Sequence, residues 1–490
     1  MDHDTKGLNR RRFLQVAAST TAALGVVPRR VLGGPGHAAP SGTLTLACIG
    51  MGWQGMRMLS GLLKRSDVRV VAVCDPNTDS SDYVGWGRGK EGARGFRGGR
   101  EPGREMVDAH YGRSQPSGAS KGCAAYADFR ELLENQKDLD AVHIVTPDHT
   151  HATLAIAAMK KGKHAAMHKP VANRMYEARL TVDTASRTGR VTHLHAWRDC
   201  KELYTIGEWI RQGAIGPVRE VHRWLYKPIW PQGTPCLPAD TPAVPKGFDW
   251  DLWLGPVPHR PYSPQYTHAV YRGWYDFGGG CLADMGYYGL WMDWRIMELG
   301  AATGAEGCAS FTCEVRGYQS GTVKNDVSFP HASTVRLHLP ARGKMPPCDV
   351  VWYDGGMRPP TPKELVAAGE QMPHTGVMFV GDEGKILAGY QYEKPRILPE
   401  KKMREAASIK PPDVKIVSTE DEWVNAFRAG KPSRGSFQNV RHLAEAICLG
   451  NIAIRLNARL EWDDANMTIT NNPAANRYLR RDEYRKGWEL

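Results

Sequence analysis

The chain has 490 residues, of which 41% are hydrophobic, enough for two or three domains with sizeable cores. Its formal charge of +12 lies partly in the tail: residues 1–38 hold six Lys or Arg and two Asp, which leaves +8 for the rest. These positive residues are interspersed with acidic ones and no RNA-binding motif occurs, which argues against a nucleic-acid partner.

The amino-terminal tail has the pattern of an export signal. Residues 9–15, Asn-Arg-Arg-Arg-Phe-Leu-Gln, resemble the twin-arginine signal, and the apolar run Val16–Val27 behind them is too short for a permanent membrane span. Small residues for cleavage follow at 36–39. We therefore expect residues 1–40 to be a signal peptide, recognised by the twin-arginine export machinery, that sends the folded protein to the periplasm or otherwise out of the cytoplasm. The alternative is a chance arginine cluster on a soluble tail.

All ten cysteines lie beyond this tail, and none forms a CxxC pair. Cys48 and Cys74 fall in predicted core strands. Cys308, Cys313 and Cys348 could form bridges in an oxidising compartment, which the sequence leaves open.

A dinucleotide-binding unit follows the tail. An apolar strand, Leu44–Ile49, runs into a glycine-rich turn, a helical pattern follows, and a second strand, Val68–Cys74, ends in Asp75. The turn consists of Gly50, Met51, Gly52, Trp53, Gln54 and Gly55, all of which we expect to contribute to the cofactor site. The alternative is a glycine-rich turn that binds no nucleotide.

Each part of this unit has a physical role. Gly50 permits the tight turn, Gly52 lets the backbone approach a pyrophosphate, and Gly55 lets helix and sheet pack closely while the helix N-terminus faces the phosphates. Asp75 would accept hydrogen bonds from the adenosine ribose and repel a 2′-phosphate. The sequence therefore predicts NAD as cofactor, with NADP disfavoured.

The segment Asp79–Gly122 interrupts the alternation of strands and helices. It is rich in Gly, Arg and Ser, so we predict a long surface loop with one short helix near Glu101–Tyr111. Its arginines could reach the cofactor phosphates, but a solvated insertion is the favoured interpretation. The alternation resumes with a helix at Phe129–Asn135 and a buried strand at Ala141–Val145.

Two later strand ends carry polar residues. Thr146, Pro147, His149 and His151 follow one strand, and His168 and Lys169 follow the strand Lys163–Met167. Carboxyl ends of parallel strands are where an open α/β sheet binds its ligand. We therefore expect both segments to meet at the nicotinamide end of the nucleotide.

The chain changes character beyond residue 217. Strand-like segments at Val218–Tyr226, Ser333–Leu339 and Val350–Trp352 are separated by long loops rich in Pro and Gly, which predicts a largely antiparallel sheet with helices on one face. The expected fold class is α/β, with a Rossmann domain at 41–172 and a substrate and oligomerisation domain at 173–490.

These motifs together resemble the Gfo/Idh/MocA oxidoreductases, the family of glucose-fructose oxidoreductase and inositol dehydrogenase. The likeness rests on the glycine turn, on Asp75, on Thr146, Pro147 and His151, on Lys169-Pro170, and on the run Gly278–Gly286. The carboxyl-terminal Tyr484–Trp488 resembles an exported subgroup of that family.

The resemblance implies a second domain whose open sheet packs against another subunit, hence a homo-oligomer. It also implies that Lys169 lies beside the nicotinamide and the reacting hydroxyl, with Asp284 across the pocket. Two positions depart from the family pattern. Tyr288 stands where the usual catalytic histidine would be, and His168 replaces the glutamate before the lysine.

The residues present still allow hydride chemistry. Removing hydride from a carbinol carbon requires a base for the hydroxyl proton within hydrogen-bond reach. Burial and a positive nicotinamide ring should lower the pKa of Lys169, and a nearby ammonium should make the Tyr288 phenol more acidic, so that it donates or relays a proton. Asp284 would bind substrate hydroxyls or hold Lys169. The alternative for Tyr288 is an ordinary half-buried tyrosine.

Other side chains are candidate ligands for a metal or for a sugar. Strand-end histidines occur at His143, His149, His151, His164, His168, His193 and His195. A zinc site needs three or four converging ligands, whereas histidines in a nucleotide pocket usually bind ribose, substrate or backbone, so no metal is expected. For a sugar ring, Arg272 and Trp274 before the glycine run, and Arg198, are the candidate contacts.

We therefore expect an exported, NAD-dependent oxidoreductase that acts on a CH–OH group of a sugar, polyol or glycoside and recycles a tightly bound cofactor. One alternative is a redox-neutral glycosidase, in which bound NAD oxidises a ring carbon, elimination cleaves the glycosidic bond and the hydride returns. Another is a catalytically inactive protein that binds sugar or nucleotide.

Overall fold

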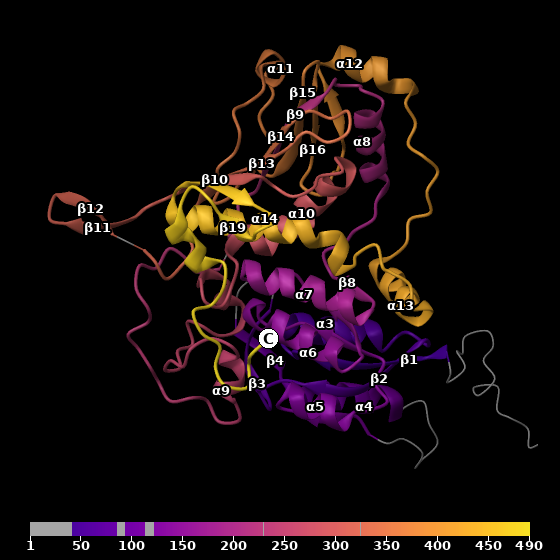
Figure 1. Ribbon diagram of the computed structural model, residues 1–490, viewed down its shortest axis with the longest axis vertical. Coiled ribbons are helices and arrows are strands. Elements are labelled where there is room, and N and C mark those ends of the chain that lie inside the picture. Colours follow the sequence, from indigo (N-terminus) through magenta and orange to yellow (C-terminus); the bar gives the residue numbers. More distant parts are fainter. Residues whose placement is uncertain (1–41, 86–93, 113–121, 229, 324) are drawn as a thin grey trace, which may run out of the picture.

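The structure is a computed structural model that describes residues 42–85, 94–112, 122–228, 230–323 and 325–490. The predicted signal peptide lies outside these ranges. In Figure 1 the first sheet and its helices form the lower half and a second sheet forms the upper half, with helices between them. Among the described residues, no helix is long and apolar enough to cross a bilayer.

The first half is a parallel sheet of the Rossmann type, as predicted. Its strands, in spatial order, are β5 (Ala124–Tyr126), β2 (Val68–Cys74), β1 (Leu44–Ile49), β6 (Ala141–Ile144), β7 (His164–Met167) and β8 (Thr192–Leu194). The helices that follow or connect them are α3 (Trp53–Leu62), α4 (Arg100–Gly112), α5 (Phe129–Asn135), α6 (His151–Lys160) and α7 (Met175–Thr188). Every β6 residue is buried, as expected of a central parallel strand covered on both faces.

The first sheet extends beyond the boundary predicted at residue 172. β8 pairs in parallel with β7 as the sixth strand, so the sheet ends at Leu194. Helix α13 (Thr419–Ala429), far along the chain, also packs beside β1 and β8, where Figure 1 shows it at the edge of the lower half. Two elements from beyond residue 172, β8 and α13, therefore belong to the first half.

The insertion after Asp75 is more ordered than predicted. The predicted helix near Glu101–Tyr111 is confirmed as α4, which spans 13 residues. Before it, where a loop was predicted, the chain forms an antiparallel pair, β3 (Ser80–Val84) and β4 (Arg94–Gly98). Gly98 packs so closely that a Cβ there would lie 2.6 Å from the Met51 carbonyl oxygen. The hairpin is thus fixed against the glycine turn rather than free in solvent.

The second half is a mixed sheet in which most neighbours are antiparallel, as predicted. The order is β17 (Arg396–Leu398), β16 (Lys385–Ala388), β15 (Gly376–Gly381), β9 (Val218–Trp224), β14 (Cys348–Tyr353), β13 (Ser333–Leu339), β10 (Gly304–Ala309), β18 (Arg459–Asp463) and β19 (Thr468–Ile469). Only β9 and β14 pair in parallel among these neighbours. Along β13, Val335, Leu337 and Leu339 are buried and Arg336 and His338 alternate with them, so one face is apolar and the other polar.

Helices cover the apolar face of this sheet and join it to the first half. α10 (Gly280–Ile296) and α14 (Phe437–Leu456) lie between the two sheets in Figure 1, with α8 (Lys201–Arg211) beside them. Ser436 caps α14 by accepting a hydrogen bond from the Asn439 amide, and the helix packs against both α7 and α10. One continuous hydrophobic core therefore spans both halves and fixes their relative position.

The smaller elements lie around this framework. They are α9 (Trp250–Leu254), α11 (Lys363–Ala367), α12 (Glu400–Glu405), the hairpin β11 (Thr312–Arg316) and β12 (Gln319–Val323), and short 3₁₀ turns at Asp148–Thr150, His268–Gly273, Ala406–Ser408 and Pro473–Tyr478. The segment between β9 and α10 reaches back to the first sheet. There the Thr78 amide donates to the Gly247 carbonyl (2.8 Å) and the Asp249 amide to the Pro76 carbonyl (3.0 Å).

Candidate nucleotide-binding and active site

The glycine turn has the shape that the sequence predicts. Gly50 has φ +94°, and a Cβ there would lie 2.3 Å from the Val145 carbonyl oxygen. A Cβ on Gly55 would lie only 1.8 Å from the Gly50 carbonyl oxygen. Larger residues are excluded at both positions, because the backbones of β1, β6 and α3 approach too closely for a side chain.

Helix α3 presents a free N-terminus to the pocket beside this turn. Gly52 is its N-cap, and no side chain caps it among the described residues. The first amides of a helix have no partner inside the helix, and together with the helix dipole they favour an anion. This end of α3 therefore fits the pyrophosphate of a dinucleotide.

Asp75 lies at the end of β2, as predicted, but its carboxylate already has protein partners. The Met51 amide donates to it at 2.7 Å, the Asn77 amide at 2.8 Å and the Tyr83 hydroxyl at 3.2 Å. Burial raises the pKa of Asp75, and these donors oppose the rise. The carboxylate lines the pocket with oxygen lone pairs left for ribose hydroxyls.

These elements border a cavity that opens to solvent. The predicted residues that line it are Gly50, Gly52, Trp53, Gln54, Gly55, Asp75, Thr146, Pro147, His168 and Arg272. Most come from the carboxyl ends of β1, β2, β6 and β7, so the fold brings together the segments that the sequence placed at one sheet edge.

Sequence reasoning missed the residues that cover this cavity. Tyr83 from the β3–β4 hairpin and Phe248 and His268 from the segment before α10 also line it. The Tyr83 and His268 rings lie 4.2 Å apart between centroids, so two distant segments meet over the pocket. The Gly-rich stretch that contains Tyr83 is predicted from the sequence as a surface loop, and nothing local in the sequence marks Phe248 or His268.

A buried charge cluster adjoins the inner end of the cavity. Lys169 after β7 donates to Asp284 near the start of α10, and Arg272, which lines the cavity, donates to the same carboxylate at 3.0 Å. Burial lowers the pKa of Lys169, and the Asp284 charge partly opposes this. Burial alone would raise the pKa of Asp284, but Lys169 and Arg272 hold it below its usual range. Asp284 is therefore an anion that positions two cations.

Tyr288 lies one turn after Asp284 on α10 and faces the same cluster. Its hydroxyl is 3.2 Å from His168 Nε2, and the Lys169 ammonium is 5.2 Å from its ring centroid. The expectation that this phenol is unusually acidic is wrong, because burial and then the Asp284 charge raise its pKa. Burial and the Lys169 charge lower the pKa of His168 well below its usual value. A neutral phenol can therefore donate to a neutral imidazole.

Three predicted cofactor residues support the pocket from behind its surface. Met51 is fully buried and contributes its amide to Asp75. His149 contacts the Trp253 carbonyl (2.9 Å), and His151 contacts the Pro170 (2.6 Å) and Thr146 (2.8 Å) carbonyls. Through these contacts both rings hold neighbouring loops together. Burial also lowers the pKa of His149 to about 3.

Asp148, which lies between these residues, is a tie that the sequence analysis did not single out. Its carboxylate accepts from the Tyr271 hydroxyl and from the Gly279 amide, both at 3.1 Å. It thereby fixes the start of α10, and with it Asp284, to the β6 end of the first sheet.

Two predicted sugar contacts lie outside the cavity lining. Trp274 is 5% exposed, packs on Tyr266 and donates its indole N–H to the Gln265 carbonyl at 2.8 Å. Arg198 is exposed and donates to Gln391. Of the three candidates, Arg272 alone borders the cavity.

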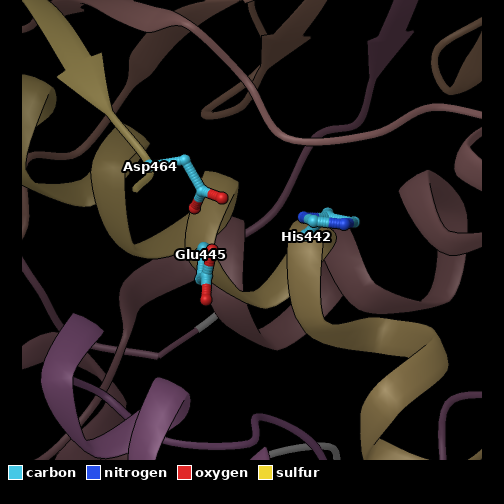
Figure 2. A group of neighbouring side chains, drawn as sticks. All are labelled: His442, Glu445 and Asp464. Carbon is cyan, nitrogen blue, oxygen red and sulfur yellow. The ribbon is translucent and has the colours of Figure 1, made fainter. Parts of the chain in front are cut away.

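The strand-end histidines do not converge on a common point. His143 and His195 contact each other (Nε2 to Nε2, 3.0 Å) beside Trp423, while His193 contacts Ser433. In the part of the chain that the structure describes, one group has the spacing of metal ligands: His442, Glu445 and Asp464 (Figure 2).

That group is an ion-pair network. Arg179 donates to Glu445 at 2.9 Å and to Asp464 at 2.6 Å, and Arg441 donates to the same two carboxylates at 3.1 and 3.3 Å. Two guanidinium groups already neutralise both acids and would repel a cation, so this donor set does not fit a metal ion.

Two family comparisons match successive parts of the chain. Residues 100–195 match an oxidoreductase family described by its NAD-binding Rossmann fold, and residues 218–293 match the C-terminal alpha/beta domain of that oxidoreductase family. The first half of the chain is thus an NAD-binding Rossmann domain. The glycine turn and the α3 N-terminus form a cradle that suits this cofactor.

Individual proteins match parts of the chain at about 30% identity. The glycosyl hydrolase family 109 protein 2 of Shewanella sp. (strain ANA-3) is 29% identical over 248 residues, which span 46% of this chain and about half (48%) of that relative. The levoglucosan dehydrogenase of Pseudarthrobacter phenanthrenivorans is 33% identical over 94 residues, 19% of this chain and 24% of that one.

A solved structure resembles the whole fold. The WlbA dehydrogenase from Bordetella pertussis, in complex with NADH and UDP-GlcNAcA, aligns with a TM-score of 0.51 and 14% identity, covering 86% of this chain and 99% of that chain. At this identity the likeness concerns the fold, and it agrees with the two-sheet architecture described above.

Proposed function

We propose that this chain, as a member of the Gfo/Idh/MocA oxidoreductases, is an NAD-dependent enzyme that oxidises a CH–OH group of a sugar, polyol or glycoside. The observation that carries the proposal is the buried cluster of Lys169, Asp284 and Arg272 beside the nucleotide cavity. A base held next to a nicotinamide site is what alcohol oxidation requires.

The protein side of the reaction follows from this cluster. Bound NAD would accept the hydride. Asp284 holds Lys169 in place, and burial lowers the pKa of the lysine so that its neutral form is accessible as the acceptor of the hydroxyl proton. Arg272 lines the cavity and can donate hydrogen bonds to substrate oxygens.

Tyr288 and His168 extend the proton path in this proposal. The phenol stays protonated and donates toward His168, which lies at the cavity surface. The pair thus provides a donor next to Lys169 in place of the family's usual histidine. Asp75 restricts the cofactor to NAD, because its carboxylate would repel a 2′-phosphate.

We further propose that the chain is exported by the twin-arginine route, on the pattern at residues 9–15, and works as a homo-oligomer. A periplasmic enzyme has no free nucleotide pool, so the cofactor would stay bound, and the hydride taken from the CH–OH group would pass to a second, carbonyl-bearing substrate before the next cycle. Tyr83, Phe248 and His268 cover the cavity and support retention of the cofactor.

A redox-neutral glycosidase is the alternative with a specific observation in its favour. The Shewanella relative bears the name of a glycosyl hydrolase family, although the match spans about half of it. In such a reaction a transient ketone would acidify the neighbouring C–H and elimination would expel the aglycone. Water would then add to the resulting enone at the anomeric carbon, and the hydride would return to the ketone carbon. From the same position, Lys169 would accept the hydroxyl proton during the oxidation and give it back when the hydride returns.

A second alternative is a sugar-binding or nucleotide-binding protein without turnover. It is motivated by His168 and Tyr288, which depart from the family pattern. Lys169→Met separates the two cases. A binding protein would keep its ligand affinity and have no activity to lose, whereas the proposed enzyme would keep NAD and lose turnover.

One experiment tests the proposal and divides the two reactions. The purified protein is incubated with panels of free sugars, polyols and aryl glycosides, while nicotinamide absorbance and aglycone release are followed together. Reduction of the bound nicotinamide, by up to one equivalent per chain and without aglycone release, indicates the dehydrogenase. Aglycone release without such reduction indicates the glycosidase. Failure to bind NAD or NADP under any condition would refute both.

A further inference from the structure

A second cavity lies apart from the nucleotide pocket and shares no lining residue with it. It encloses about 820 Å³ with its mouth, between the end of the Pro473–Tyr478 turn, the start of α7 and the segment that leads into α10. Five arginines line it: Arg174, Arg455, Arg477, Arg480 and Arg481. Such a concentration of guanidinium groups in one concave site requires an explanation.

Nearby carboxylates pair with some of these arginines and not with others. Asp276 lies 3.5 Å from Arg174, but Arg260 already holds it at 2.5 Å. Asp482 and Glu483 also line the cavity, yet neither has an ion pair among the described residues. The remaining cavity arginines differ in how firmly they are held.

Two of them are tied into the fold and two are not. Arg481 pairs with the buried Glu177 at 2.7 Å, and Arg455 pairs with Asp326 at 2.9 Å. Within the described chain, Arg477 and Arg480 have no carboxylate in ion-pair range. These two exposed side chains are therefore free to turn toward an anion in the cavity.

Arg174 shows that positive charge is in excess at the cavity floor. Its side chain is 13% exposed and donates to the Asn173 and Tyr275 carbonyls at 3.0 and 2.8 Å. Burial, and then the neighbouring Arg481, lower the pKa of its guanidinium to about 10. A negative group in the cavity would reduce the repulsion between these guanidinium groups. It would also supply counter-charge that Asp276, which Arg174 shares with Arg260, does not fully provide.

The lining of the cavity indicates what kind of anion fits. Beside the arginines, Asp482 and Glu483 offer acceptors for hydroxyl groups, so a molecule with both an oxyanion and hydroxyl groups, such as an acidic sugar, matches the cavity better than a bare sulfate or phosphate. Arginine forks match planar carboxylates and tetrahedral phosphates or sulfates by paired hydrogen bonds. Arg455 is itself held between the rings of Tyr275 (4.4 Å) and Tyr478 (4.3 Å), so its fork has a fixed position.

We propose that this cavity is a second ligand site, which binds the oxyanion group of an acidic sugar, with Arg174 and Arg455 as its floor and Arg477 and Arg480 as mobile clamps. The site is independent of the nucleotide pocket and of the reaction proposed there. Its neighbour, the segment at Tyr275 and Asp276, leads directly into the helix that carries Asp284.

Binding is tested by calorimetry on the full-length protein, with glucuronate, glucose 6-phosphate, inorganic sulfate and neutral glucose as probes. We expect saturable 1:1 binding of at least one acidic sugar, tighter than sulfate, and none of glucose. The double variant R477Q/R480Q should weaken this binding at least about tenfold, because it removes the two guanidinium groups that have no carboxylate partner and are free to bind the oxyanion. R404Q is the matched control, because Arg404 is an exposed arginine on α12 and does not line the cavity.

Three results would overturn the proposal. They are no saturable binding of any acidic sugar, binding no tighter than that of sulfate, or binding that R477Q/R480Q leaves as strong as R404Q does. Both variants alter exposed side chains, so their melting temperatures should equal that of the parent chain. NAD content, measured on the same samples, should not change, which separates this site from the nucleotide pocket.

Discussion

Replacing Gly55 by alanine should abolish tight NAD binding, because of one backbone contact. The new Cβ would lie 1.8 Å from the Gly50 carbonyl oxygen, whereas real Cβ atoms keep at least 3.0 Å from such atoms. The turn must therefore open by at least about 1.2 Å, the difference between these distances, which moves the α3 amides off the pyrophosphate. Losing two amide contacts to a charged group costs about 3 to 6 kcal/mol, or roughly 10² to 10⁴ in Kd.

Gly61→Ala is the matched control in the same helix. A Cβ there meets nothing within 4 Å, so this variant should keep its NAD affinity and gain about 0.5 to 1 kcal/mol in the free energy of unfolding. The assay is NAD titration by calorimetry on protein stripped of nucleotide, with urea unfolding of both variants. If Gly55→Ala bound NAD as tightly as Gly61→Ala, the assignment of this turn to the pyrophosphate would be wrong.

Further predictions concern the charges and the cover of the pocket. Asp284→Asn should destabilise the fold by about 3 to 5 kcal/mol in urea unfolding, because Lys169 and Arg272 would remain buried without their carboxylate. In its pH profile the acid limb of kcat/KM should move to lower pH: the base must be neutral, and removing Asp284 takes away a charge that raises the pKa of Lys169; an unmoved limb would exclude Lys169 as the base. Asp75→Ala should reduce the preference for NAD over NADP at least about tenfold in titrations with each nucleotide, since roughly 1.4 kcal/mol of repulsion suffices for this; unchanged selectivity would place the ribose elsewhere. Tyr83→Phe should weaken NAD binding by about 1 kcal/mol through Asp75 and speed nucleotide release in stopped-flow measurements, and an unchanged release rate would show that the hairpin is no cover.

The parts of the site that depend on local sequence could be predicted. Gly50, Gly55 and Asp75 lie within one strand, turn and strand, and backbone geometry alone restricts those positions. Parallel strand ends meet at one edge of a sheet, so the approach of Lys169 to the nucleotide pocket followed from topology. The antiparallel character of the second sheet followed from strand-like segments, such as the one that forms β13, separated by long loops rich in Pro and Gly.

The remainder depends on contacts between distant segments. Nothing near Tyr83 in the sequence indicates that His268 will pack on it, since 184 residues separate the two. Tryptophan is a residue type that can stack on a sugar ring, yet the Trp274 ring lies in an aromatic core assembled from several loops. The pKa of Tyr288 was misjudged because burial, which only the tertiary structure reveals, outweighs the nearby cation.

The nucleotide content of the purified protein tests the central claim most directly. The protein is prepared without added cofactor and denatured, and the released dinucleotide is quantified against protein. A closed redox cycle with retained cofactor predicts about one equivalent of NAD(H) and a Kd in the nanomolar range or below, about 12 kcal/mol of binding free energy. Empty sites that fill only at millimolar NAD would contradict the account and indicate a dehydrogenase that exchanges its cofactor with a free pool.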